Sequence, residues 1–220
     1  MKNLSPQRPL SLVARFGLGL LPWIIQALYL PLNRLQSGGI APQIAGLDDL
    51  IPLIPWWTVP YLLTLVLWAA APIWAAISMP DRLYRAFLIS LSCIILVGIF
   101  CFTFFPTYVV RPEISASDPA MAPIRFLYSS DNVYNALPSG HAYITALLTF
   151  YWSRWKPRLR PVWWAILLMV LLSTLFTRQH YVLDLAAGLA LAGGGYALGL
   201  WRMGLIAPPA AQRTALSKQA

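Results

Sequence analysis

Residues 135–141 read Asn-Ala-Leu-Pro-Ser-Gly-His, and this polar stretch leads into a strongly apolar segment that we expect to be a helix. Proline at a helix start costs no hydrogen bond, because its missing N–H would have no partner there, and the small residues beside it leave the first amides free. A helix start of this kind is an anion-binding site. His141, on the first turn, could then give a proton to the bound anion or take one from it.

The composition is that of an integral membrane protein. Of the 220 residues, 59% are apolar and 10% are charged, and the mean hydropathy is +0.64, far outside the usual range for a soluble domain. The first apolar segment begins near Leu10, continues past Tyr29 and has no small-residue cleavage pattern, so we interpret it as a membrane span and not as a signal peptide. The net charge of +9 is spread over short loops between apolar segments, so we expect no nucleic-acid partner.

Six apolar segments are long enough, or nearly long enough, to cross a bilayer as helices of about 20 residues. They lie near residues 10–31, 56–78, 83–105, 140–154, 161–178 and 181–204, and the fourth is short. The predicted fold class is therefore all-α: a polytopic membrane protein with six transmembrane helices in a bundle. This membrane domain spans residues 10–206, between an N-terminal tail at 1–9 and a C-terminal tail at 207–220.

The distribution of Lys and Arg predicts the orientation, because these residues are retained on the cytoplasmic side of a membrane. In the six-span arrangement, the basic residues of the outer side are few: Arg34, Arg111, Arg125 and Arg178. Both tails are therefore expected in the cytoplasm, in a multi-pass protein of a bacterial plasma membrane. The loop 106–139 and the link 178–181 then share the outer face. This brings His141 and the other histidine of the chain, His180, to the same depth.

His180 belongs to a second polar interruption of the apolar chain. It stands four positions before Asp184, so the two share one face if the last helix begins near residue 180. The carboxylate would then accept the hydrogen of one imidazole nitrogen and leave the other nitrogen as a nucleophile. His141 could donate a proton to a leaving oxygen. A carboxylate inside an apolar run is costly, which favours a functional role for Asp184.

Donors for a phosphoryl group are also present. We predict that Arg111, Arg178 and the amides near Ser139 and Gly140 bind phosphoryl oxygens. With the two histidines they describe phosphoryl transfer through a phosphohistidine. Structural explanations stay open beside this one, because a histidine in a membrane protein is often a packing residue and Arg178 could extend to the interface from an apolar surface.

Three further patterns favour structural roles. A metal site is disfavoured because two histidines and one nearby carboxylate are few ligands, and no cofactor is predicted. Gly193–Gly195 is expected to let neighbouring helices approach closely, since it has neither the preceding strand nor the following lysine of a phosphate-binding loop. Asp48 and Asp49 are interpreted as a solvated surface pair.

These residues resemble the motifs of the type 2 phosphatidic acid phosphatase superfamily, a family of membrane lipid-phosphate enzymes related in their site to vanadium haloperoxidases. The second motif of that family, Pro-Ser-Gly-His, stands unchanged at 138–141. The third motif is matched at Ser173, His180 and Asp184, in the right order and at the right spacing.

Two basic positions of the family's motifs are altered in this chain. Thr174 replaces the arginine of the third motif, and Phe104 replaces the lysine of the first motif, which keeps Arg111 and Pro112. These positions are commonly altered in the branch of the family that includes the inositol phosphorylceramide synthases. Three segments of this chain look closest to that branch: 104–107, 135–139 and 177–184. In that branch Arg178 would take over phosphate binding.

The resemblance covers roughly residues 50–205 and implies a six-span bundle with an outward-facing site. It makes His180 the nucleophile, Asp184 its orienting partner and His141 the acid. The implied activity is that of a metal-independent phosphatase for a lipid phosphate of the phosphatidic acid or prenyl diphosphate type. Two alternatives stay open: a lipid head-group phosphotransferase of the inositol phosphorylceramide synthase type, and a non-enzymatic six-span transporter.

Overall fold

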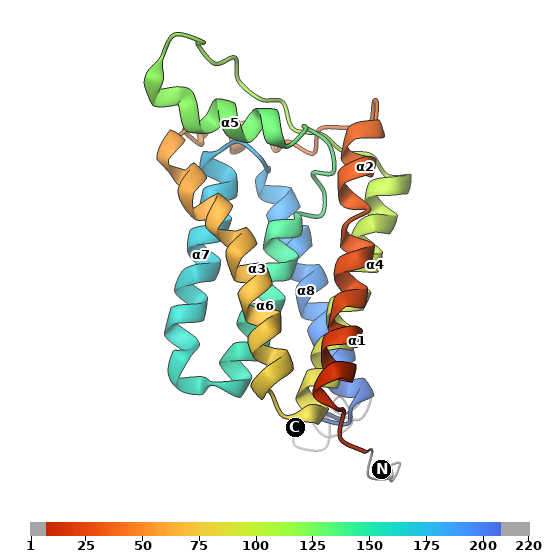
Figure 1. The fold of residues 1–220 in the computed structure, drawn as a ribbon. Helices are drawn as coiled ribbons and strands as arrows, with labels where there is room; N and C mark the ends of the chain where they lie inside the picture. Colours follow the sequence, from red (N-terminus) through yellow and green to blue (C-terminus); the bar gives the residue numbers. More distant parts are fainter. Residues whose placement is uncertain (1–7, 208–220) are drawn as a thin grey trace, which may run out of the picture.

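The structure is a computed structural model that describes residues 8–207, and these residues form helices and loops with no strand among them. The α-helices are α1 (Leu12–Gln26), α2 (Tyr29–Leu35), α3 (Thr58–Ser78), α4 (Asp81–Phe104), α5 (Ala122–Ser130), α6 (Gly140–Trp155), α7 (Arg160–Phe176) and α8 (Val182–Arg202). Four short 3-10 helices accompany them: η1 (Asp48–Leu50), η2 (Pro55–Trp57), η3 (Pro119–Met121) and η4 (Pro157–Leu159). The long helices form a bundle, α5 lies across one end of it, and α1 begins and α8 ends at the other end (Figure 1).

Several helices have the length and composition of membrane spans. Five stretches of the described chain qualify: Leu12–Leu35, Pro55–Ser78, Asp81–Phe104, Pro157–Phe176 and Val182–Arg202. The predicted fourth span is α6, and with 16 residues it is shorter than the roughly 20 that a bilayer requires. The all-helical membrane fold is therefore confirmed, and the count of six spans is not.

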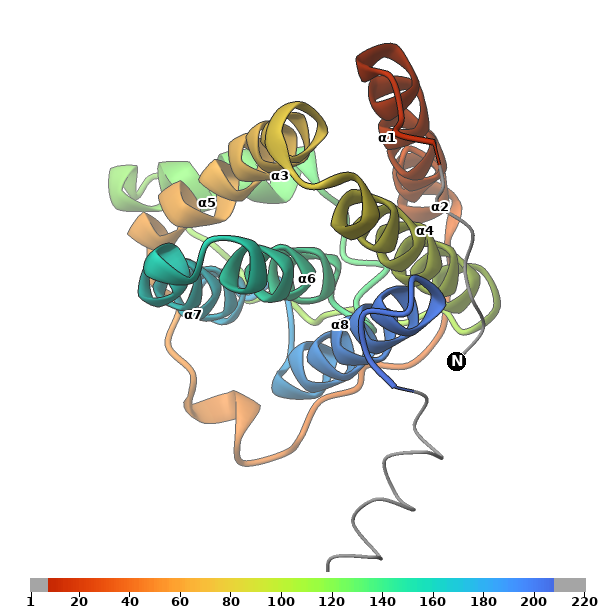
Figure 2. The same ribbon diagram turned by 90° about the horizontal axis from the view of Figure 1, so that it is seen from below.

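The position of α6 explains its different character. It runs through the middle of the bundle, with α7, α8, α4 and α3 around it (Figure 2). Most of its side chains are buried, including the polar Thr145 and Thr149. The Trp68 indole N–H of α3 donates to the Thr145 hydroxyl at 3.2 Å, and the Thr149 hydroxyl donates to the Thr145 carbonyl at 2.9 Å. Because α6 contacts protein on all sides, it needs neither the length nor the uniformly apolar surface of a lipid-facing helix.

Small residues let α8 pack closely against α4. A Cβ added at Gly199 would overlap the Ser90 hydroxyl and the Ala86 carbonyl oxygen, and one at Gly195 would overlap Ile94. The Ser90 hydroxyl donates to the Gly195 carbonyl at 2.7 Å across this contact. The prediction of close helix approach is thus confirmed for Gly195. It is wrong for Gly193 and Gly194, which have nothing within 4 Å of an added Cβ.

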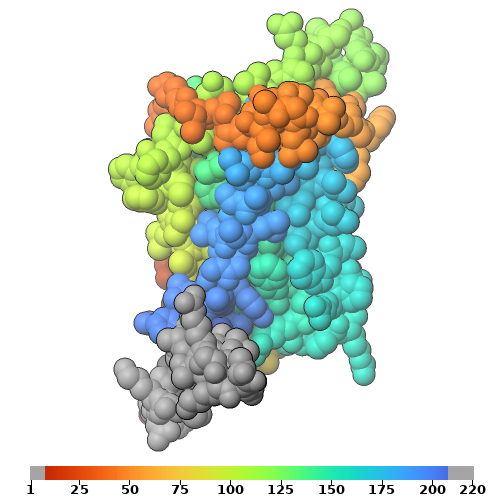
Figure 3. All heavy atoms as spheres, turned by 180° about the vertical axis from the view of Figure 1, so that it is seen from behind, coloured from red at the N-terminus to blue at the C-terminus, as the bar shows by residue number. Residues whose placement is uncertain are grey.

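The loop before α3 is fastened to the start of α8. Asp48 is 1% exposed, and its carboxylate accepts hydrogen bonds from the amides of Ile44 at 2.6 Å and Val182 at 2.9 Å. The Arg178 guanidinium donates to the Asp48 carbonyl oxygen at 2.8 Å. The predicted solvated pair is therefore wrong for Asp48 and holds for the exposed Asp49. Figure 3 shows this segment, in orange, lying over the ends of α7 and α8.

We expect Gly199→Ala to lower the thermal stability of the purified protein in detergent, because the new methyl group would push α8 away from α4. Overpacking of this kind costs about 1–3 kcal/mol. Gly193→Ala is the matched control, since its added Cβ meets no atom within 4 Å and alanine favours a helix by up to ~1 kcal/mol. Melting temperatures from differential scanning fluorimetry compare the two variants, and equal values would contradict the close packing at Gly199.

Asp48→Ala is expected to destabilise the protein by about 1–3 kcal/mol, because it leaves the amides of Ile44 and Val182 without their acceptor. Asp49→Ala serves as the control and should cost less than Asp48→Ala, because water can replace the two bonds that its exposed carboxylate accepts, from Gln43 Nε2 at 2.6 Å and the Gly46 amide at 2.9 Å. Thermal melts report the stability, and limited proteolysis reports release of the loop. A melt of Asp48→Ala that coincides with the Asp49→Ala melt would rule out the anchoring role.

Candidate active site

The two histidines meet at the end of the bundle that carries α5. His141 is on the first turn of α6. His180 stands just before α8 and is separated from it by Tyr181, the N-cap residue of that helix. Their ring centroids lie 6.1 Å apart. The prediction that the two polar interruptions come together is confirmed by this distance.

Contacts between the starts of α6 and α8 fix this arrangement. The Ser139 amide, at the N-cap of α6, donates to the Asp184 carbonyl oxygen at 3.0 Å. Gly188, one turn further along α8, faces the same point: an added Cβ would lie 2.7 Å from the Ala142 Cβ and 2.9 Å from the Ser139 carbonyl oxygen. The absence of a side chain at Gly188 therefore allows the first turn of α6 to rest on α8.

Asp184 orients His180, although the two are not on one helical face as predicted. The helix α8 begins at Val182 with Tyr181 as its N-cap, so His180 lies outside it. Asp184 Oδ2 accepts the Tyr181 amide at 2.9 Å and stands 3.3 Å from His180 Nδ1. A carboxylate at a helix N-terminus is stabilised by the unpaired amides and by the helix dipole. We assign the Nδ1 proton to this contact, which leaves the Nε2 lone pair of His180 available.

The carboxylate of Asp184 is wholly enclosed. The residue is 0% exposed, and its Oδ1 atom has no hydrogen-bond partner within residues 8–207. The backbone of the preceding link is held as well, because the Thr174 carbonyl accepts the amides of Gln179 at 3.0 Å and His180 at 3.3 Å. Together with the Asp48 loop, these bonds position His180 from both sides.

Aromatic side chains of α3 hold His141. Its ring centroid lies 4.2 Å from that of Tyr61 and 5.0 Å from that of Trp68. His141 Nε2 is buried and has no hydrogen-bond partner in the described chain. No sequence signal pointed to these two neighbours, because aromatic residues are frequent throughout apolar spans.

The predicted phosphate-binding residues have different surroundings. Arg111 lies near His180, since its guanidinium donates to Gln179 Oε1 at 2.6 Å. It also donates to the backbone carbonyls of Asp131 at 2.8 Å and Asn132 at 2.9 Å. Burial lowers the pKa of Arg111 from its ordinary value, and the Asp131 carboxylate raises it in part. The contacts of Arg178 tie it to the Asp48 loop, and none of them ties it to either histidine.

The start of α6 offers two backbone donors. The Ser139 amide is occupied by the Asp184 carbonyl, and the Ser139 hydroxyl accepts the Ala142 amide at 3.3 Å. The amides of Gly140 and His141 belong to the first turn, where no acceptor exists within the helix. Of the phosphate-binding donors that the sequence predicts, these two N–H groups and the Arg111 side chain are the ones placed at the histidine end of the bundle.

The two altered motif positions supply no basic group in the structure. Phe104 ends α4 with 64% of its surface exposed. Thr174 is fully buried, and its hydroxyl donates to the Leu171 carbonyl at 2.8 Å. Arg111 is therefore the one motif arginine of this chain that lies beside His180.

Sequence reasoning missed Asp131, which follows α5. Its carboxylate accepts the Tyr29 hydroxyl at 3.2 Å, and its backbone carbonyl accepts Arg111. Burial raises the pKa of Asp131 above its ordinary value, while the positive charge of Arg111 lowers it in part. Among residues 8–207, no three His, Cys, Asp or Glu side chains gather in a way that could hold a metal ion.

A comparison with protein families agrees with this geometry. A family model described as the PAP2 superfamily matches residues 46–198, well over half of the chain and all three motif segments. No curated protein and no solved structure matches the chain. Members of the PAP2 superfamily are phosphatases or phosphotransferases. The match does not distinguish branches, so the likeness to inositol phosphorylceramide synthases stays a prediction. The chain belongs to the PAP2 superfamily, as its Pro-Ser-Gly-His and His-Asp motifs predict.

Proposed function

We propose that this membrane protein is a phosphatase that removes phosphate from a lipid phosphate or diphosphate, of the phosphatidic acid or prenyl diphosphate type. The observation that carries the proposal is the facing pair of His141 and His180, with Asp184 behind His180. The two ring centroids lie 6.1 Å apart, so both imidazoles can contact one phosphoryl group, His180 at phosphorus and His141 at the leaving oxygen.

In the first step, the Nε2 atom of neutral His180 attacks phosphorus. The N–P bond forms as the P–O bond to the lipid breaks, and protonated His141 donates its proton to the leaving oxygen. In the second step, water attacks the phosphorus of phosphohistidine, and neutral His141 takes a proton from that water. The electrons of the N–P bond return to His180, and inorganic phosphate leaves.

The surrounding donors stabilise the charge that develops on the phosphoryl oxygens. Asp184 holds the Nδ1 proton of His180 through both steps and offsets the positive charge of the phosphorylated ring. The amides of Gly140 and His141 donate from the positive end of α6. Arg111 supplies the formal positive charge, and its bond to Gln179 keeps it beside His180.

The charge distribution supports an extracytoplasmic site. Arg82 and Arg85 at the start of α4, and Arg154 near the end of α6, lie at the end of the bundle away from the histidines. Because basic residues are retained in the cytoplasm, we propose that both tails are cytoplasmic and that the site faces outward. In this arrangement α6 completes a six-helix membrane bundle.

A second candidate function is a lipid head-group phosphotransferase, which shares the phosphohistidine and uses a hydroxyl acceptor in place of water. The altered positions Phe104 and Thr174 favour it through the likeness of motifs described above. A polar cavity beside Arg111, described below, offers space for a head group.

His180→Ala is expected to abolish phosphate release and covalent labelling. The purified protein is incubated with radiolabelled phosphatidic acid or prenyl diphosphate and quenched, and protein-bound label is tested for the acid lability of a phosphohistidine. EDTA should have no effect on turnover. Undiminished phosphate release by His180→Ala would exclude the nucleophile. Transfer to an added hydroxyl acceptor that outpaces hydrolysis would favour the phosphotransferase, and solute uptake without any phosphate release would favour a transporter.

Gly140→Pro is expected to lower kcat by about 10²–10³, the usual cost of removing one donor to a developing oxyanion. Proline suits the first position of a helix, and Ser139 before it has the extended conformation that precedes proline (φ −60°, ψ 118°). The variant therefore removes one N–H and leaves the helix intact.

Gly140→Ala is the matched control for this variant, because it keeps the amide and its Cβ would meet the Tyr143 hydroxyl at an ordinary 3.7 Å. Both variants are assayed for lipid phosphate hydrolysis after their melting temperatures have been measured. Wild-type turnover in Gly140→Pro would refute the role of the amide.

A further inference from the structure

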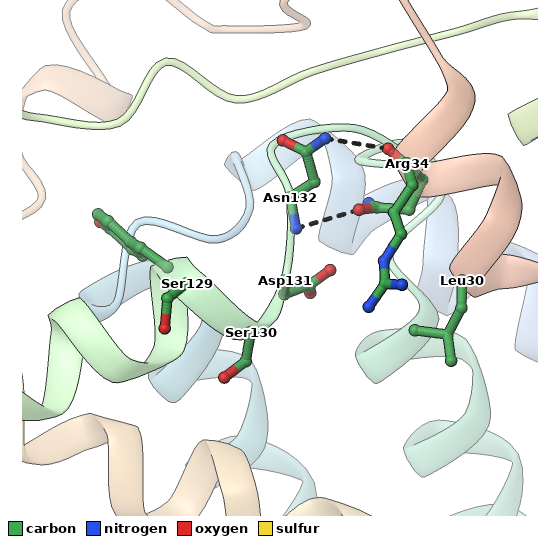
Figure 4. Close-up of a pocket in the computed structure, with 8 residues that line it drawn as sticks. Leu30, Arg34, Ser129, Ser130, Asp131 and Asn132 are labelled. Carbon is green, nitrogen blue, oxygen red and sulfur yellow. Dashed lines mark hydrogen bonds between the residues drawn. The ribbon is translucent and has the colours of Figure 1, made fainter.

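A polar cavity of about 260 Å³ opens beside the histidine site, between α2 and the end of α5. Two formal charges of opposite sign line it, Arg34 from α2 and Asp131 from the turn after α5. Figure 4 shows the two side chains extending toward each other from these walls. The walls are joined by Asn132, whose backbone and side-chain N–H groups donate to Asn33 at 3.0 Å and 3.2 Å.

The two charges face the cavity without pairing. Within residues 8–207, Arg34 makes no hydrogen bond and no ion pair, and Asp131 makes no ion pair through its carboxylate. The Asp131 carboxylate accepts the Tyr29 hydroxyl, which leaves acceptor capacity on both oxygens. A carboxylate and a guanidinium held apart across a small cavity are complementary to a ligand that has a positive group at one end and a negative group at the other.

We propose that this cavity binds a zwitterionic head group, with an anionic phosphate on Arg34 and an ammonium group on Asp131. A guanidinium and a carboxylate each form charge-assisted hydrogen bonds with such groups. With about 260 Å³, the cavity has room for a small head group such as phosphoethanolamine and not for a lipid tail. Ser130 lines the same wall, and its hydroxyl donates to the Phe126 carbonyl of its own helix at 2.8 Å.

The cavity is coupled to the histidine site through Arg111. This guanidinium donates to the Asp131 carbonyl at 2.8 Å on the cavity side and to Gln179 Oε1 at 2.6 Å on the His180 side. The head group therefore binds next to the reacting phosphoryl group. The inference extends the proposed function, because it adds to the phosphoryl site a second site that selects lipids by their head group, and its test does not depend on turnover.

The test measures binding to the purified full-length chain in detergent by saturation-transfer NMR. Phosphoethanolamine is compared with inorganic phosphate, which carries only the negative charge, and with ethanolamine, which carries only the positive charge. We expect phosphoethanolamine to bind at least tenfold more tightly than ethanolamine. Arg34→Gln should weaken phosphoethanolamine by about tenfold and change phosphate less, because phosphate also binds the histidine site, and Asp131→Asn should weaken phosphoethanolamine and ethanolamine.

Arg125→Gln is the matched control, since Arg125 is on α5 at the same end of the bundle and donates to the carbonyls of Ser115 and Asp118, away from the cavity. Arg34 is exposed on α2, so Arg34→Gln keeps the test usable if Asp131→Asn fails to fold. Equal weakening of phosphoethanolamine binding by Arg34→Gln and Arg125→Gln, or equal affinity for phosphoethanolamine and ethanolamine, would overturn the proposal.

A second arm identifies the source of the head group. The wild-type chain and Arg34→Gln are placed in nanodiscs of phosphatidylethanolamine or phosphatidylglycerol, and their melting temperatures are compared. If phosphatidylethanolamine raises the melting temperature of the wild-type chain and Arg34→Gln removes this increase, the cavity binds a membrane lipid. If free phosphoethanolamine binds and phosphatidylethanolamine has no such effect, the cavity binds a soluble ligand. Binding without hydrolysis of any lipid phosphate would support the cavity and reject the proposed phosphatase, and hydrolysis without binding would do the reverse.

Discussion

The buried carboxylate of Asp184 holds the candidate site together. Its Oδ2 atom accepts the Tyr181 amide and contacts His180, and its backbone carbonyl accepts the Ser139 amide. One residue on the first turn of α8 therefore caps its own helix, orients one histidine and fixes the helix start that carries the other. A buried charge of this kind is tolerated because helix amides and the helix dipole stabilise it. This turn therefore connects the backbone positions of the two histidines.

The loops at this end of the bundle support that turn from outside. Asp48 caps Val182 from a loop that lies far away in the sequence, and Arg178 holds the same loop through its carbonyl. Arg111 binds backbone carbonyls of the segment after α5 and the side chain of Gln179. Most of these charged groups are thus engaged with backbone atoms, which keeps polar segments ordered above an apolar bundle. Their replacement by neutral residues would remove hydrogen bonds as well as charge.

Sequence patterns predicted the helical membrane fold and the meeting of His141 and His180, since apolar runs and topology need no knowledge of side-chain contacts. They failed where the answer depended on a distant partner. Asp48 looked like a surface residue, because its contact with Val182 joins positions 134 residues apart. The count of six spans is not confirmed, because α6 has only 16 residues and lies inside the bundle, and hydropathy does not distinguish such a helix from one that faces lipid. Asp131 and Tyr61 carried no motif that could have identified them.

The sequence by itself determined which residues have the chemistry for phosphoryl transfer: the order and spacing of Pro138–His141, His180 and Asp184, and the family that these motifs indicate. Tertiary structure decided how these groups are held and what surrounds them. It placed His180 outside α8 and occupied the Ser139 amide. It also opened a charged cavity between Arg34 and Asp131. The physical reason is that spacing along a chain fixes local geometry, whereas burial and pairing depend on segments that meet only after folding.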